Sequence, residues 1–468
     1  MKLNYKRTIL VGVAFFLISA FWQAYDAIVP LILTNHFGLS QLWSGIIMSL
    51  DNVLAVFMLP LFGSLSDKVN TRFGKRKPFI FVGTVAAVAC FVVLTLVDNI
   101  QLARISLTSI PADAVAAGTD EAALGAVLAR AFEITAANPA PLIIFIGVLL
   151  LVLISMATFR SPAVALMPDV TVKPLRSKGN AIINLMGAAG GVIVLALGIL
   201  FATSKQKYNP YTPYVICVCG IMLLGFVVFM LTVKEKKWAA EMEADTVRLG
   251  LDEPVVQGEQ ATEQKKLSKA EFRSLLLILA SVALWYIGYN SITSKYSVYA
   301  TNILGFDYNL TLIIAQAAAI VSYIPVGAVA SKIGRKKTIL AGIIMLASAF
   351  LIGNFITPTT PELIMYPVFI LAGIGWATIN VNSFPMVVEL AKSGNVGKYT
   401  GYYYTASMSA QIVAPILSGI LYTISMRLFF FSFGTLFVAL SFVTMLFVKH
   451  GDSIPEKQGA LESLGNDD

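Results

Sequence analysis

The sequence predicts an all-α membrane protein with about twelve transmembrane helices, because its composition is strongly apolar and long apolar runs recur along it. Of the 468 residues, 57% are hydrophobic and only 13% are charged, and the mean hydropathy is +0.78. A soluble chain of this length needs far more polar surface. The runs approach the ~20 residues that cross a bilayer as a helix, whereas barrel strands are shorter and alternate in polarity.

The apolar runs divide into two sets of six. We expect the first set at residues 9–33, 46–65, 79–97, 142–166, 181–202 and 214–233. The second set is expected at residues 275–293, 310–329, 339–356, 363–382, 402–424 and 428–448. The sequence thus predicts a first six-helix bundle, a polar cytoplasmic linker, a second six-helix bundle and a disordered cytoplasmic tail, with boundaries at residues 1–233, 234–271, 272–449 and 450–468.

Lysine and arginine give the orientation of the spans. The net charge is +8, and the cations gather in the short loops after the second, fourth, eighth and tenth spans. Short basic loops remain in the cytoplasm, so we expect both termini and these loops to be cytoplasmic. This pattern accounts for the positive charge without a nucleic-acid partner. The expected location is a bacterial-type inner membrane, which the chain crosses many times.

The segment between the third and fourth spans, residues 98–141, is unusually long and is expected outside the cell. After an acidic start, apolar residues recur there at helical spacing: Leu124, Val127, Leu128, Ala131 and Phe132. Such spacing predicts an amphipathic helix that lies on the outer face.

A basic hairpin punctuated by glycine occurs at residues 60–78 and, in degenerate form, at residues 325–337. A second pair of similar segments, residues 165–169 and 385–389, follows the fourth span of each half. The two pairs together indicate an internal duplication. We expect an ion-paired cytoplasmic gate with glycines at close helix contacts and tight turns, although the cations could serve topology alone. The residues expected in the gate are Gly63, Asp67, Arg72, Gly74, Arg76, Gly327, Gly334 and Arg335.

These hairpins carry a resemblance to a known family. Residues 327–337 have the spacing of the major facilitator superfamily loop Gly-x-x-x-Asp-x-x-Gly-Arg-Lys, with Ser331 at the aspartate position. The first copy, lengthened by residues 70–73, resembles sucrose transporters, animal proton-coupled sugar carriers and glycoside-pentoside-hexuronide symporters. The resemblance covers nearly the whole chain in topology, and its specific motifs lie in the first half. It implies two rocking bundles that give alternating access to a central site.

Two carboxylates fall inside predicted spans, where a charge is costly and therefore informative. Asp26 precedes an apolar-proline step, and the sugar carriers that the chain resembles have an acidic residue in a similar setting that is suspected of proton coupling. The alternative is that Asp26 is a structural partner for a buried cation. Asp51 is either a second coupling residue or a polar helix contact beside Asn52. We expect the coupling ion to be H⁺.

Arg160 is the third intramembrane charge. Residues 160–168 resemble the fourth helix of melibiose-type symporters, which have a sugar-binding aspartate where this chain has Arg160. Other aspartates of that family, one for sugar and two for sodium, are missing here, at positions near Ser19, Ala55 and Leu59. These departures argue against a sodium site like that of the melibiose-type symporters. Arg160 could pair with Asp26 or Asp51, or could bind an anionic substrate group through two hydrogen bonds.

Amides and aromatic side chains in the spans could recognise a carbohydrate, which presents hydroxyl edges and apolar faces. Each alone could equally be a packing residue. The residues we expect to bind substrate are Gln23, Arg160, Asn184, Trp285, Asn290, Trp376, Asn380 and Gln411.

The sequence contains no phosphate-binding glycine loop, zinc-binding helix pattern or nucleophile elbow, so we expect neither an enzyme nor an ATP-driven pump. It predicts a monomeric, proton-coupled secondary active transporter in the lipid bilayer, with a sugar or glycoside as its small-molecule substrate and without cofactor or metal. One alternative is an exporter of drugs or organic anions on the same fold. Another, a non-transporting sensor, would need a signalling domain for which the linker and tail offer little material.

Overall fold

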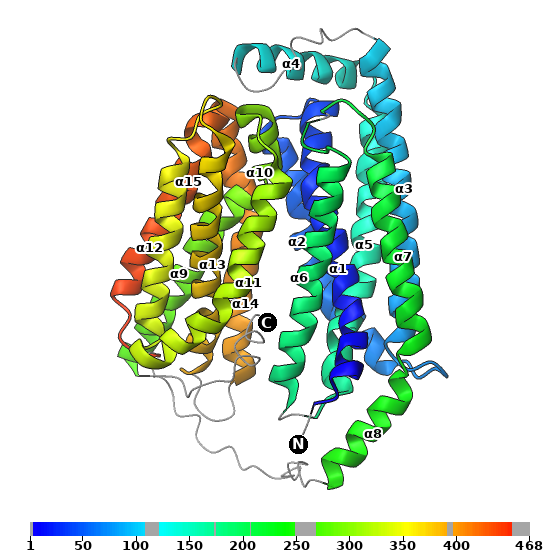
Figure 1. Ribbon diagram of the computed structural model, residues 1–468, viewed down its shortest axis with the longest axis vertical. Coiled ribbons are helices and arrows are strands. Elements are labelled where there is room, and N and C mark those ends of the chain that lie inside the picture. Colours follow the sequence, from blue (N-terminus) through cyan, green and yellow to red (C-terminus); the bar gives the residue numbers. More distant parts are fainter. Residues whose placement is uncertain are drawn as a thin grey trace.

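The computed structural model describes residues 3–107, 121–172, 175–205, 207–248, 268–390 and 396–451. These residues form helices, and they contain no strand beyond an isolated bridge between Thr71 and Gly74. Figure 1 shows two bundles of long helices side by side, with α4 (Glu121–Ala137) lying across one end. The prediction of an all-α fold is confirmed.

Each bundle contains six long helices, as the two sets of apolar runs predict. The first bundle consists of α1 (Tyr5–Leu31), α2 (Gln41–Lys68), α3 (Lys77–Leu107), α5 (Ala140–Asp169), α6 (Arg176–Leu200) and α7 (Thr212–Thr232). The second consists of α9 (Lys269–Thr293), α11 (Tyr308–Ile333), α12 (Arg335–Gly353), α13 (Met365–Val388), α14 (Val396–Ile424) and α15 (Met426–Leu446). Short helices connect them: η1 (Ile32–His36), α8 (Glu235–Arg248), α10 (Tyr296–Val298), η4 (Tyr299–Leu304) and η5 (Glu362–Ile364).

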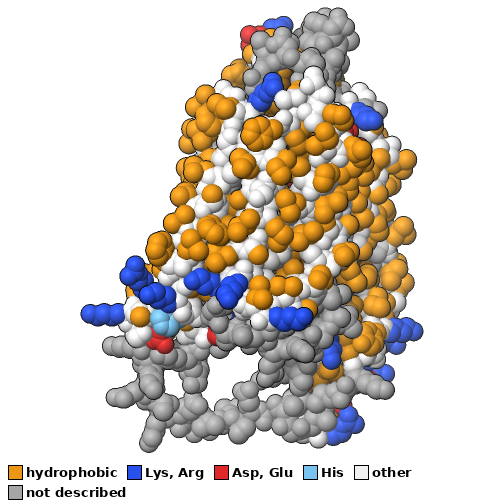
Figure 2. Space-filling model, turned by 60° about the vertical axis from the view of Figure 1, so that its left-hand side comes forward, with side chains coloured by type: hydrophobic (Ala, Val, Ile, Leu, Met, Phe, Trp, Pro, Cys, Tyr) orange, Lys and Arg blue, Asp and Glu red, His pale blue; other side chains and the backbone are white. Residues whose placement is uncertain are grey.

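The outer surface is suited to lipid. In the described part of the chain, eleven helices are long and apolar enough to cross a membrane, and α11 is apolar from Tyr308 to Tyr323. Figure 2 shows hydrophobic side chains over most of the height of the molecule, with Lys and Arg gathered toward one end. The side chains of Leu200, Leu231 and Phe355 are more than three-quarters exposed. In lipid, a helix satisfies its own backbone and can present such side chains outward.

Local sequence fixes several helix starts. Asn4 accepts a hydrogen bond from the backbone of Arg7 at the start of α1, and Ser40 does the same for α2. Ser268 and Glu271 form a reciprocal capping box at the start of α9. Each cap supplies an acceptor to an N–H that the helix itself cannot satisfy.

The two ends of the molecule differ. We call the end that carries Arg76, Lys77, Arg335 and Lys336 the basic end, and the end crossed by α4 the α4 end. At the α4 end the bundles are in tight contact along a seam between α2 and α14. An ideal Cβ on Gly45 would lie 2.2 Å from the Pro415 carbonyl oxygen, so only glycine allows this approach. Figure 1 shows the bundles diverging toward the basic end.

Hydrogen bonds between buried side chains close the same end of the molecule. The Lys295 side chain is fully buried, and its ammonium group donates to the Ser44 hydroxyl of the other bundle. Asn302 Nδ2 donates to Asn35 Oδ1 over 2.6 Å. The seam is therefore both polar and closely packed.

Helix α4 lies in the long segment for which the sequence predicts an amphipathic helix. Gly38, with a φ of +65°, brings the turn after η1 against it, because a Cβ there would lie 2.3 Å from the Phe132 nitrogen. Gln101 Nε2 donates to the Thr135 hydroxyl over 2.9 Å and to the His36 carbonyl over 3.0 Å. These contacts attach α4 to the first bundle.

Within residues 234–271, for which the sequence predicts a linker, α8 follows α7 almost directly. The guanidinium of Arg7 lies 5.0 Å from the Trp238 ring and pairs with Glu241, which ties α8 to the start of α1. Residues 249–267 of this segment, and the predicted tail from residue 452 onward, lie outside the described residues.

Candidate functional site

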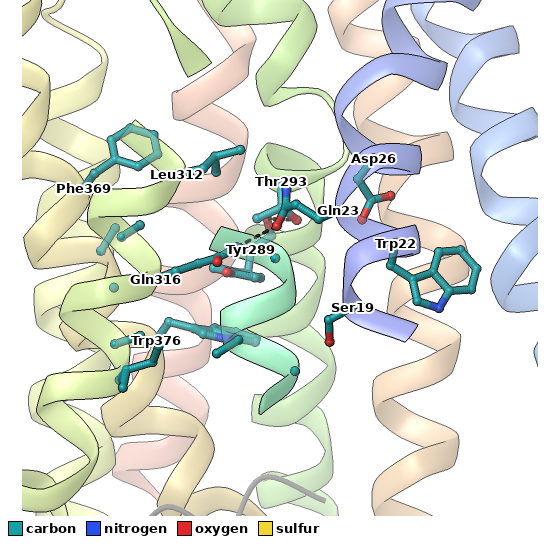
Figure 3. Close-up of a pocket in the computed structure, with 18 of the residues that line it drawn as sticks. Ser19, Trp22, Gln23, Asp26, Tyr289, Thr293, Leu312, Gln316, Phe369 and Trp376 are labelled. Carbon is teal, nitrogen blue, oxygen red and sulfur yellow. Dashed lines mark hydrogen bonds between the residues drawn. The ribbon is translucent and has the colours of Figure 1, made fainter. Parts of the chain in front are cut away.

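A cavity of about 610 Å³ lies between the two bundles. Its lining comes from α1, α5 and α6 on one side and mainly from α9, α11 and α13 on the other, as Figure 3 shows in part. Small residues on α6, Ala181, Gly187, Ala188 and Gly191, leave the space open. The volume is typical of a site for a small organic molecule.

An amide bridge joins the bundles across the cavity. Gln316 Nε2 on α11 donates to Gln23 Oε1 on α1 over 2.6 Å (Figure 3). Gly191 lies beside the bridge, where a Cβ would be 3.3 Å from Gln316 Oε1 and 3.5 Å from Gln23 Oε1. Gln316 Oε1 is buried and accepts no hydrogen bond from the described residues. A buried amide oxygen without a donor is unfavourable, so this position suits a water or a ligand hydroxyl.

An aromatic pair forms part of the opposite wall. The rings of Tyr289 and Trp376 stack with centroids 3.6 Å apart and planes 6° apart, and both residues line the cavity. Tyr286 packs edge-on against the same Trp376 ring at 5.3 Å. The edge-on contact restrains the indole, so the pair offers a fixed apolar surface beside the amide bridge.

Two charged residues line the cavity, Asp26 from α1 and Arg160 from α5. Both side chains are open to the cavity although they lie deep inside the molecule. The Arg160 guanidinium lies 5.9 Å from the centre of the Trp22 ring. Figure 3 shows Trp22 and Asp26 directed away from the Gln23 side of α1.

Asp51 lies behind this surface rather than on it. Its Oδ1 accepts hydrogen bonds from the backbone and side-chain nitrogens of Asn52, at 2.5 and 2.7 Å. Its charge interacts with those of Asp26 and Arg160. In the described part of the chain, however, Arg160 forms an ion pair with neither carboxylate.

The structure brings five of the residues expected at the site to the cavity: Gln23, Asp26, Arg160, Asn184 and Trp376. The other substrate-binding candidates lie outside the lining. Trp285 is fully buried in the second bundle, and the amides of Asn290 and Gln411 donate to carbonyls of their own helices. Asn380, one turn beyond Trp376, accepts from the Tyr286 hydroxyl at 3.3 Å. These assignments stay predictions.

Gln316, Tyr289, Ser19, Trp22 and Thr293 also line the cavity, and the sequence-based assignment omits them. A signal for part of this set was present. Residues 19, 22, 23 and 26 are spaced three and four apart and therefore share one face of a helix.

The gate residues expected from the first hairpin form a network at the basic end. Arg76 Nε donates to Asp169 over 2.8 Å, and its terminal nitrogens contact Asp67 at 2.5 Å and Ser66. Burial disfavours the charged form of Arg76, but the bonds and charges of Asp169 and Asp67 outweigh it and raise its pKa. Gly63 lies against Ser161, whose Oγ would be 2.9 Å from a Cβ.

The carboxylate of Glu235 is bound by the start of α3. It accepts from the backbone nitrogens of Lys75, Arg76 and Lys77 at 2.7, 2.8 and 2.9 Å. Gly74, with a φ of +117°, makes room, because a Cβ would lie 2.3 Å from that carboxyl group. Arg72 lies apart from this network, with its guanidinium 4.6 Å from the Phe73 ring.

The second hairpin repeats the arrangement. Arg335 pairs with Glu389 as Arg76 pairs with Asp169. Lys336 donates to carbonyls at the end of α15, as Lys77 does at the end of α7. Gly334 turns the chain between α11 and α12 with a φ of +90°, and Gly327 lies within α11. The two halves therefore correspond in their contacts as well as in sequence.

The described residues contain no group of three or more His, Cys, Asp or Glu side chains that could hold a metal ion. The polar groups that face the cavity are amides, hydroxyls, one carboxylate and one guanidinium, which suit the binding of an organic solute.

The family model for the Major Facilitator Superfamily matches residues 11–409 and 308–464. No curated protein matches the chain. Among solved structures, the fold is similar to an inward open conformation of the xylose transporter XylE from E. coli, with a TM-score of 0.63, 14% identity, and 98% of this chain and 99% of that chain covered. It is also similar to a D-xylose-proton symporter, with a TM-score of 0.60, 15% identity, and coverage of 96% and 99%.

A third similar structure is a bacterial homologue of the iron transporter ferroportin in an inward-facing state, with a TM-score of 0.63 and 14% identity over 95% of this chain and 99% of that chain. Identities this low show a shared fold. The family model, in contrast, matches most of the sequence itself. This multi-pass membrane protein therefore belongs to the Major Facilitator Superfamily.

Proposed function

We propose that the protein is a secondary active transporter that moves a sugar or glycoside by alternating access, coupled to protons. The observation that carries the proposal is the cavity between the bundles, where the Gln23–Gln316 amide bridge lies beside the Tyr289–Trp376 stack. A sugar presents hydroxyl edges that suit amides and apolar faces that suit aromatic rings.

The amide bridge suits alternating access because its two halves belong to different bundles. A ligand hydroxyl that inserts between Gln23 and Gln316 would contact both bundles at once. A ligand shifts a conformational equilibrium only by binding one state better than another. A solute that spans the bridge has this differential affinity, since the two amides separate when the bundles rock.

The contacts between the bundles support an inward-facing state. The seam at the α4 end is closed by the Gly45–Pro415 contact and the Lys295–Ser44 hydrogen bond, while the bundles diverge toward the basic end. The positive-inside rule predicts that the basic end is cytoplasmic. The cavity would then exchange solute with the cytoplasm in this state and with the outside in the opposite one.

Asp26 is the proposed proton carrier. Its side chain is open to the cavity, and no hydrogen bond from the described residues reaches its carboxylate. An ionised carboxylate at this depth is costly, so protonation would ease the change of state that carries the site across the membrane. Asp51, whose charge interacts with that of Asp26, would take part in the same step.

The test is alkalinisation outside right-side-out proteoliposomes that contain the purified protein, triggered by monosaccharides, disaccharides, glycosides and uronides. We expect at least one of them to cause proton uptake that protein-free vesicles do not show. Silence across the panel, with folded protein, would overturn the proposal and favour an exporter of drugs or organic anions. Solute uptake without a pH change would refute proton coupling but would leave the proposed transport of the solute intact.

A further inference from the structure

We propose that an anionic phospholipid binds in a groove on the outside of the second bundle, with one acyl chain between α11 and α12 and its phosphate between Lys332 and Lys337. This binding site is separate from the proposed solute site, because the groove and the central cavity share none of their described lining residues. It is inferred from the lining of the groove, from its length and from the lysines at one of its ends.

The groove has a volume of about 670 Å³ and is lined by α11, α12 and α13. Helix α13 packs closely against both of the others. A Cβ on Gly373 would lie 2.3 Å from the Ala315 carbonyl oxygen of α11, and one on Gly375 would lie 3.0 Å from the Gly342 carbonyl oxygen of α12. Helices α11 and α12 therefore form the walls of the groove, and α13 forms its floor.

The lining suits a hydrocarbon chain. It is apolar apart from three hydroxyl groups, and each of these donates over 2.7 Å to a carbonyl three or four residues earlier in the chain: Ser322, Thr338 and Thr378. Their hydrogens are therefore unavailable to a polar ligand. Val321 is 73% exposed, so the groove is open to the bilayer.

The groove is long enough to follow an acyl chain through one leaflet. On α11 its lining runs from Ile314 to Val329, which at a rise of 1.5 Å per residue is about 22 Å. One leaflet takes up half of a hydrocarbon core of about 30 Å, or about 15 Å. The Val329 end of the groove lies toward the basic end of the molecule.

A lysine continues each wall of the groove at that end. Lys332 follows Val329 on α11 by three residues, and Lys337 precedes Ala341 on α12 by four. Residues at these spacings share one face of a helix, and both Val329 and Ala341 line the groove. Both lysines are exposed, and neither forms an ion pair in the described part of the chain.

The neighbouring charges leave these two lysines to a ligand. Arg335 pairs with Glu389, and Lys336 donates to carbonyls at the end of α15. The basic end is predicted to be cytoplasmic, and basic pockets between helices on that side bind anionic headgroups. An anionic phospholipid joins the two requirements, because its phosphate suits the lysines and its acyl chain suits the groove.

The site would act on the wall of the central cavity. Gln316 and Tyr323 of α11 line the cavity, whereas Ala317 and Val321 of the same helix line the groove. A lipid in the groove would therefore contact the helix that carries the second half of the amide bridge.

The experiment measures which lipid the purified full-length protein binds. Native mass spectrometry compares phosphatidylglycerol with phosphatidylcholine of identical acyl chains, and phosphatidylglycerol with a photoreactive chain maps the site by cross-linking. At low salt we expect phosphatidylglycerol to bind about 30-fold more tightly, because each lysine near an anionic lipid contributes about fivefold. The cross-links should fall within residues 314–345.

The variants separate headgroup from chain. Lys332→Gln combined with Lys337→Gln should remove the preference for phosphatidylglycerol, and Ala341→Phe, which places a ring in the groove, should remove the cross-links. The matched control is Lys269→Gln combined with Lys449→Gln, two exposed lysines at the basic end of the same bundle but outside the groove. It should keep both the preference and the cross-links.

Equal binding of the two phospholipids by the parent protein, or cross-links outside residues 314–345, would overturn the inference even if the variants failed to fold. Displacement of the lipid by inorganic phosphate would assign the lysines to a free anion, and equal affinity for oleate would show that a single-chain acid suffices; either result would refute a phospholipid site. A dimer that Ala341→Phe dissociates would show that a second copy covers the groove. These measurements need no transported solute, so their outcome is independent of the proposed function.

Discussion

Gly45 offers a direct test of how the bundles meet at the α4 end. In Gly45→Ala the new Cβ would lie 2.2 Å from the Pro415 carbonyl oxygen, whereas ordinary contacts begin at 3.4 Å. A backbone oxygen on a helix cannot swing aside as a flexible side chain can. The seam must therefore separate by about 1 Å, and overpacking of this kind costs about 1–3 kcal/mol.

That cost applies only to the state in which the seam is closed. The equilibrium should shift toward the state open at the α4 end by roughly 5- to 150-fold, since about 1.4 kcal/mol is a factor of ten. Spin labels on exposed Ile100 of α3 and Leu428 of α15, one in each bundle, would report the separation by pulsed electron resonance. We expect a longer-distance population that the parent lacks.

The matched control is Gly147→Ala on α5, where an added Cβ has no neighbour within 4 Å. Its distance distribution should equal that of the parent protein. If Gly45→Ala also gave the parent distribution, the close approach of α2 and α14 would not govern the state of the seam, and the inward-facing interpretation would lose its steric basis.

Four further predictions follow from the site and the ends of the helices. Asp26→Asn should abolish accumulation against a gradient yet leave exchange intact in counterflow assays; unchanged accumulation would remove Asp26 from coupling. Gln316→Ala should weaken solute binding about tenfold, as expected for one lost hydrogen bond. Gln411→Ala, a change outside the cavity, should leave solute affinity unchanged. Equal losses of affinity in binding titrations of the two variants would contradict a role of the amide bridge in solute binding. Glu235→Ala leaves the backbone N–H groups of Lys75, Arg76 and Lys77 unpaired. It should lower the unfolding free energy by about 1–3 kcal/mol, seen as a lower melting temperature in detergent; an unchanged melt would show that water replaces the carboxylate. Burial lowers the pKa of Lys207 to about 8 from 10.5, so between pH 8 and pH 10.5 the unfolded chain binds more protons than the folded one and stability should rise with pH. Lys207→Met should melt at a higher temperature at pH 7 and should lose that rise. The same dependence of melting temperature on pH in both proteins would refute this prediction.

The sequence was sufficient for the fold because bilayer thickness sets helix length and leaves few alternatives. The hairpin pattern also predicted ion pairs at the basic end, and Arg76 and Arg335 form them. That these pairs act as a gate stays a prediction. The sequence was less informative about the cavity. Of the residues expected to bind substrate, Gln23 and Trp376 line the cavity and Trp285 is buried elsewhere, whereas Gln316 lines it and was not among the residues chosen.

The sequence leaves undetermined how each membrane helix is rotated about its own axis, and therefore which of its side chains face the cavity. In a soluble helix, apolar periodicity tells which face is buried, but lipid and protein interior are both apolar, so periodicity carries little information in a span. Trp285 and Tyr289 are one turn apart on α9, and only the packing of the second bundle decides which reaches the cavity. Charged residues escape this ambiguity because lipid excludes them, which is why Asp26 and Arg160 were recognisable.

The lysine ties at the basic end have a mechanical consequence. Lys77 joins the start of α3 to the end of α7 over a separation of 153 residues, and Lys336 joins α12 to α15 over 110. Each tie fastens the third long helix of a bundle to the sixth, so the free ends cannot splay independently. The basic end of each bundle should therefore move as one stiff body. A change of state that opens or closes this end would displace two rigid sets of helices rather than single helix ends.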